Sequence, residues 1–177
     1  MKVKTSDLVL IAMFTAIIAA LSQIQVPMPT CVPATLQTFA IAFCGYFLGA
    51  KRGAAAVSAY ILLGVVGVPI FAGFKGGFAC LGSFTGGFIY GFLAMVVLCG
   101  LKVNGKPLKI VMGISGVAAL HFFGVLHYAL LTPNDFMRSF LLVSAPYLLK
   151  DFVSAVLGYF AALAVSRATK GIVKPRI

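Results

Sequence analysis

Two neighbouring charges, Lys150 and Asp151, are the residues of this sequence best suited to hold a polar ligand. They lie near the start of a long apolar stretch. Because a charge in lipid is costly, such residues usually face a bundle interior or a cavity. A structural role is an equal alternative, in which Lys150 extends to the membrane surface and Asp151 caps a helix. Lys75, the only charge between Gly53 and Leu101, has the same two interpretations.

Motifs of enzyme chemistry are absent from the sequence. His121 and His127 are six residues apart, which puts them about 240° apart around a helix rather than on one face. The only acidic residues are Asp7, Asp135 and Asp151, too few for a well-supplied metal site or proton relay. No phosphate-binding loop or protease motif occurs. We therefore expect no enzyme activity and no metal, and active transport would need energy from another subunit.

The composition predicts that most of the chain lies in lipid. Of the 177 residues, 62% are hydrophobic and 10% are charged. A soluble domain carries about 25% charged residues, because its surface must be polar. The length fits a single integral membrane domain, residues 1–177, with no room for a separate soluble domain.

Long runs without charge indicate the membrane spans. Since a charge is costly inside a bilayer and a span needs about 20 apolar residues, each such run holds one or two spans. Pro27, Pro29 and Pro33 divide the first run into two. We predict an all-α bundle of six transmembrane helices over residues 8–25, 36–50, 53–69, 81–101, 110–131 and 147–166.

The basic residues orient this bundle. With the N-terminus inside, eleven Lys and Arg residues fall on the inner side and three, Lys75, Arg138 and Lys150, on the outer side. The positive-inside rule therefore predicts that both termini are cytoplasmic. The net charge of +11 needs no nucleic acid partner, because the charges lie at loop ends between apolar spans.

Two outer loops are unlike solvated connections. The loop 26–38 contains three prolines and no charge, together with Val, Met and Leu residues that a solvated loop would not need. The loop 68–88 is rich in Phe and Gly, and glycine lets backbone approach a ligand closely. We predict that both fold over the outer end of the bundle as a binding lid. Cys31 and Cys80 belong to these loops. A disulfide between them is one interpretation, and two free thiols are the simpler one.

Small residues recur four apart in several spans, a spacing that lets helices approach closely in lipid. We expect most of these stripes to pack within the bundle and at least one to serve a partner protein. They are Ala12, Ala16 and Ala20; Gly45 and Gly49; Gly87 and Gly91; and Ser154, Gly158, Ala162 and Ser166.

Three ordered blocks of the sequence resemble the BioY family, the biotin-binding S components of energy-coupling-factor transporters. The first comprises residues 33–38 and the span end 48–53, the second residues 64–73 and 84–92, and the third residues 146–151. Together they cover nearly the whole chain. The resemblance implies six helices in a bacterial cell membrane, both termini cytoplasmic, and a ligand site under the extracellular loops.

The resemblance also implies how the ligand is held. Biotin would be the transported ligand, with no cofactor, and Asp151 would accept a charge-assisted hydrogen bond from its ureido ring. An apolar channel of Phe71, Phe74 and Phe78 would hold the tail, whose carboxylate would meet basic or polar side chains. The candidate substrate-binding residues are Asp151, Lys150, Lys75, Gln37, Thr35, Thr85, Phe74 and Tyr147.

Partners and alternatives follow from the same resemblance. Ala12, Ala16 and Ala20 would dock on a transmembrane coupling subunit that pairs with two ATPase subunits. Family members often carry a Lys three residues after the Asp, where this chain has Ser154 and Lys150 could substitute. An S component for another small vitamin stays open, as does a structural or assembly membrane protein that binds no solute. An intramembrane enzyme is a more distant alternative.

Overall fold

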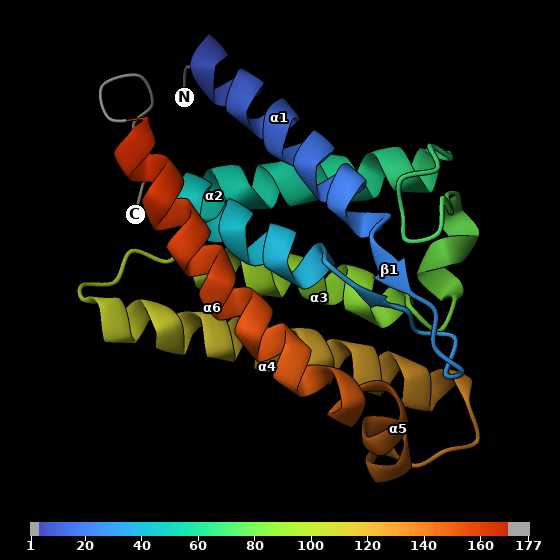
Figure 1. The fold of residues 1–177 in the computed structure, drawn as a ribbon. Coiled ribbons are helices and arrows are strands. Elements are labelled where there is room, and N and C mark those ends of the chain that lie inside the picture. The colour runs from blue at the N-terminus through green and yellow to red at the C-terminus, as the bar shows by residue number, and fades with distance from the viewer. Residues whose placement is uncertain (1–3, 170–177) are drawn as a thin grey trace.

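The computed structural model describes residues 4–169, which are helical over most of their length (Figure 1). This confirms the all-α prediction. In chain order the elements are α1 (Thr5–Ser22), β1 (Gln25–Val26), β2 (Ala34–Thr35), α2 (Gln37–Val66), the 3-10 helix η1 (Phe78–Gly82), α3 (Gly86–Cys99), α4 (Lys106–Leu131), α5 (Phe136–Val143) and α6 (Ala145–Ala168).

Helix α2 folds back on itself at Gly49. The backbone there has φ 77° and ψ 167°, a conformation that glycine adopts without a side-chain clash. The Gln37 side chain donates to the Tyr60 hydroxyl at 2.7 Å, which requires residues on either side of the reversal to lie side by side. The two arms, 37–48 and 50–66, therefore run in opposite directions (Figure 1). Lys51 and Arg52, expected in a connecting loop, lie instead in the second arm.

The number of long helices differs from the predicted six transmembrane helices. In the described part of the chain, four helices are long and apolar enough to cross a bilayer: α1, α2, α4 and α6. The reason is that α2 holds both the second and the third predicted spans, with no loop at Gly49. Helix α3 has 14 residues, shorter than the about 20 of a straight crossing, and the 8-residue α5 lies between the fifth and sixth predicted spans.

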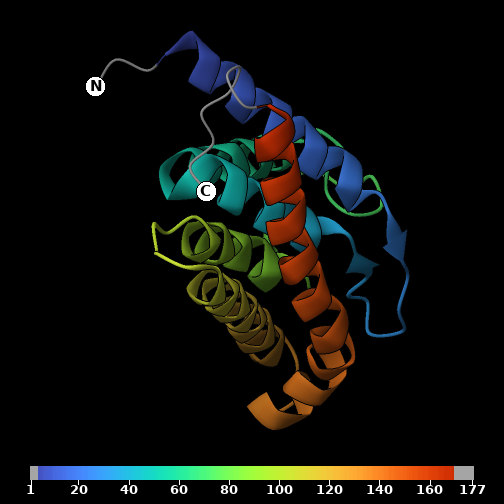
Figure 2. The same ribbon diagram turned by 60° about the vertical axis from the view of Figure 1, so that its left-hand side comes forward.

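Close packing of the helices explains most of the small-residue stripes. A Cβ atom on Gly45 would lie 2.7 Å from both the Cys99 Cβ and the Val96 carbonyl oxygen, so only glycine lets α2 approach α3 this closely. On α6, Ser154, Gly158 and Ala162 are buried, and this helix packs against α2 and α4 (Figure 2). These stripes hold the bundle together.

The two ends of the bundle carry different elements. The start of α1, the reversal in α2, the α3–α4 loop and the end of α6 lie at one end, and β1, η1 and α5 lie at the other (Figure 1). At the first end Asp7 pairs with Arg52 at 2.9 Å. Four basic residues assigned to the inner side, Lys2, Lys170, Lys174 and Arg176, fall outside the described residues. The rest of that set belongs to elements at the first end.

Candidate ligand-binding site

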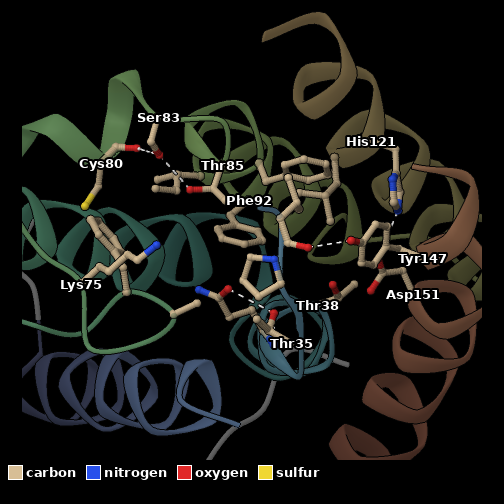
Figure 3. Close-up of a pocket in the computed structure, with 18 of the residues that line it drawn as sticks. Thr35, Thr38, Lys75, Cys80, Ser83, Thr85, Phe92, His121, Tyr147 and Asp151 are labelled. Atoms are coloured by element: carbon tan, nitrogen blue, oxygen red, sulfur yellow. Dashed lines mark hydrogen bonds and ion pairs between the residues drawn. The ribbon is translucent and has the colours of Figure 1, made fainter. Parts of the chain in front are cut away.

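A cavity of about 310 Å³ lies at the end of the bundle that carries the long loops (Figure 3). Its size is within the range of small-molecule sites. Both predicted lid loops contribute to its wall, as do α2, α3, α4 and α6. Residues from the beginning, middle and end of the chain therefore meet at one place.

The polar end of the cavity is built around Asp151, whose relative exposure is 5%. Asp151 is the seventh residue of α6, so it does not cap the helix N-terminus. The Lys150 ammonium donates to one carboxylate oxygen and, at 2.9 Å, to the Thr35 backbone carbonyl. Lys150 therefore neutralises the buried carboxylate instead of extending to a membrane surface, and both residues line the cavity.

His121 of α4 binds the other oxygen of the Asp151 carboxylate. Its Nε2 atom lies 3.1 Å from Asp151 Oδ2, and its Nδ1 atom lies 2.9 Å from the Ser144 hydroxyl. Sequence reasoning considered His121 only as a partner of His127 and missed this role. An ionisable residue inside an apolar span was the available signal. Thr38, which also lines the cavity, was missed beside the predicted Gln37.

Thr35 and Gln37, two of the candidate substrate-binding residues, line the cavity from the junction of β2 and α2. Both are buried, and the Thr35 hydroxyl donates to the Gln37 side-chain oxygen at 3.1 Å. The Gln37 amide in turn donates to the Tyr60 hydroxyl, which donates to the Ile70 carbonyl at 3.2 Å. These bonds fix both side chains at the cavity wall.

Tyr147 anchors the first loop over the cavity through the hydrogen bonds of its hydroxyl group. Its hydroxyl donates to the Val32 carbonyl at 2.6 Å and lies 2.9 Å from the Thr30 hydroxyl. The pairing of β1 with β2 closes the same loop. Cys31 at its tip and Cys80 in the second loop are both free thiols.

The second loop makes a tight turn between Phe71 and Lys75, whose backbones pair with each other. Phe74 at this turn has φ 55°, and its side chain is 70% exposed. Phe78 is 75% exposed. Of the three predicted channel residues, Phe71 lines the cavity, whereas Phe74 and Phe78 are exposed and do not line it.

The rest of the cavity wall is mostly apolar, formed in part by Phe88, Ile89, Phe92 and Leu120. The candidate residue Thr85 also lines it, with its hydroxyl 2.9 Å from that of Ser83. Lys75 is exposed at the rim, and Figure 3 shows it on the opposite side of the cavity from Asp151. The site thus offers a buried polar end, aromatic walls and a cation at the rim.

The sequence profile of the BioY family matches residues 1–171. The chain belongs to the BioY family. The biotin transporter BioY of Thermotoga maritima is 31% identical over 164 residues, which cover 91% of this chain and 96% of that protein. The biotin transporter BioY2 of Lactococcus lactis is 33% identical over 169 residues, covering 93% and 92%.

The fold is also similar to a solved structure, the S-component for biotin from an ECF-type ABC transporter. The TM-score is 0.82 at 23% identity, with 94% of this chain and 95% of that chain covered. The likeness supports the arrangement of the helices in this BioY protein.

Position 154 is where this BioY chain departs from the expected family pattern. Ser154 is buried on α6, one turn beyond Asp151. The ammonium that balances the carboxylate comes from Lys150, on the preceding position.

The predicted docking alanines lie on α1, away from the cavity. Ala12, Ala16 and Ala20 are exposed. Ala12 and Ala16 border an apolar groove of about 610 Å³ between α1 and the second arm of α2, where Ala59 and Leu63 form the other side. The groove between α1 and the second arm of α2 is therefore separate from the ligand cavity.

Proposed function

We propose that this protein is the biotin-binding S component of an energy-coupling-factor transporter, which captures biotin outside the cell and delivers it across the membrane. The observation that carries the proposal is the cavity itself, with a buried lysine–aspartate pair at one end and aromatic walls beyond it. The names of the family's curated members, biotin transporters, point to the same ligand.

The chemistry of biotin suits the two ends of the cavity. Its ureido ring carries two N–H donors and one carbonyl acceptor, and an ionised carboxylate such as Asp151 accepts hydrogen bonds only. The Lys150 ammonium can donate to the ureido carbonyl. The aliphatic tail then lies along Phe71, Phe88 and Phe92, and its carboxylate reaches toward Lys75 at the rim. A charge-assisted bond at the buried end would supply most of the specificity.

The proposed topology has six crossings of the cell membrane by one integral domain. The two antiparallel arms of α2 count as separate crossings, and α3 completes the set within the bundle. The basic end is cytoplasmic, with both termini, which leaves the cavity beneath the extracellular loops. Short crossings are tolerated because a bilayer can thin around them.

The proposed partners are a transmembrane coupling subunit and two ATPase subunits. The exposed alanines of α1 and the adjoining apolar groove support docking of a partner helix, since small residues permit close approach in lipid. Transport energy would come from the ATPases, and the chain itself would not be an enzyme.

Mass spectrometry of the protein purified in detergent, without added vitamin, tests this function. We expect biotin to co-purify in a ratio near one to one. A different vitamin would assign the chain to another substrate, which is the alternative that Ser154 keeps open. A protein that carries no vitamin, and then fails to take up biotin during dialysis, would contradict the proposal.

A further inference from the structure

His121 joins the ligand cavity to the junction between α5 and α6. Its side chain is 4% exposed and lines the cavity. The ring lies between the side chains of Asp151 and Ser144. We infer that His121 is a positioning residue for ligand binding: fixed by Ser144, it holds the Asp151 carboxylate in the orientation that accepts the ligand's N–H groups. This inference rests on the proposed function.

The protonation pattern of this chain of groups follows from what each atom can do. An ionised Asp151 only accepts hydrogen bonds, so the His121 Nε2 atom, 3.1 Å away, must carry the proton. In a neutral imidazole the Nδ1 atom is then an acceptor, so the Ser144 hydroxyl, 2.9 Å away, would be the donor. Hydrogen bonds thus run in one direction, from Ser144 through His121 to Asp151.

This arrangement fixes both oxygens of the carboxylate. His121 donates to Oδ2 and Lys150 to Oδ1, so the plane of the group cannot rotate freely. Each oxygen keeps a lone pair for another donor. A ureido ring approaching from the cavity finds acceptors that are already oriented, which lowers the entropic cost of binding.

Among the described residues, the side chains of His121 and Ser144 make no hydrogen bonds besides those to each other and to Asp151. The Ser144 side chain caps neither α5 nor α6, although Ser144 lies where the two helices meet. The His121 ring packs edge-on against Phe88, with centroids 5.9 Å apart, and Phe88 is itself part of the cavity wall. An apolar side chain could fill this volume without the cost of burying a polar ring. The polar pair is therefore best explained by its action on Asp151.

Biotin titrations of three variants test the inference. His121→Leu should weaken binding about tenfold, since a hydrogen bond to a charged group is lost. His121→Gln should recover most of that affinity, because its amide can donate to the same oxygen. Ser144→Ala should weaken binding about threefold in the wild-type background and not at all beside His121→Leu, since interacting residues are not additive.

Tyr46→Phe is the control, because Tyr46 of α2 also hydrogen-bonds to α4 but does so outside the cavity. It removes a partly buried hydrogen bond to the Lys109 carbonyl of α4, at 3.0 Å, far from the cavity lining. The thermal stability of this variant should fall while its biotin affinity stays unchanged.

Two results would show that His121 only packs against its neighbours. One is an equal loss of biotin affinity from Ser144→Ala in the wild-type and His121→Leu backgrounds. The other is a His121→Gln variant that binds biotin no better than His121→Leu. If the wild type fails to bind biotin, the proposed function itself fails, whereas unchanged variants beside a binding wild type overturn only this inference.

Discussion

Lys150 and Asp151 are adjacent in sequence, yet the Lys150 ammonium reaches the carboxylate of Asp151 at the cavity wall. Consecutive helical residues do not face each other, so the lysine must bend back. The Thr35 carbonyl, 2.9 Å from Nζ, holds it in this conformation. Lys150 therefore both balances the buried charge and ties the first loop to α6.

Replacing Lys150 with Met should weaken biotin binding by about tenfold or more, because Asp151 then lacks its counterion and burying an unpaired charge is costly. Adding Ser154→Lys to the same chain should restore much of the affinity, since position 154 lies one turn from Asp151 on the same helix. Calorimetric titration measures both. A double variant no better than Lys150→Met would show that the two positions are not interchangeable.

Tyr147→Phe should increase the rate of biotin dissociation several-fold. The substitution keeps the ring but removes the hydroxyl that holds the Val32 carbonyl at 2.6 Å, so the first loop should open more often. Hydrogen exchange of residues 27–33 should rise in the same variant. Tyr159→Phe makes the same change farther along α6, outside the cavity lining, and should alter neither quantity.

The helices were largely predictable from the sequence because their signals are local. Charge-free runs indicated where helices lie, and a helix occupies most of each predicted span. The predicted spans 36–50 and 53–69 already implied that the chain reverses near Gly49. The absence of a loop at the reversal was not predictable, because it depends on the backbone conformation of that one glycine.

The site was predictable only in part. Charge, loop composition and family resemblance led to Asp151 and Lys150, which do line the cavity. These signals gave no information about side-chain direction, and so the exposure of Phe74 at the tight turn was not foreseen. His121 was missed because its partners, Ser144 and Asp151, lie 23 and 30 residues away in sequence.

Lys75→Gln should weaken the binding of biotin about two- to fivefold, the effect expected of an exposed ion pair. The methyl ester of biotin should bind wild type and variant equally, because it lacks the carboxylate that Lys75 is proposed to meet. Competition titrations compare the two ligands. Equal effects on both would remove Lys75 from the tail site.

Ala16→Trp should abolish biotin uptake and co-purification with the coupling subunit while leaving biotin binding in detergent unchanged. The large ring would fill the groove between α1 and the second arm of α2. The control is Ala164→Trp, which places the same ring on an exposed position of α6. If the Ala16 variant still assembles, the alanines of α1 do not form the docking face.

The central claim is that this cavity binds biotin through Asp151. Its most direct test is calorimetric titration of ligand-free protein in detergent with biotin, for the wild type and for Asp151→Asn. We predict saturable one-to-one binding by the wild type and at least about tenfold weaker binding by the variant, because a charge-assisted bond is lost while the side-chain shape is kept. No heat from the wild type, or equal affinity in the two proteins, would contradict the account.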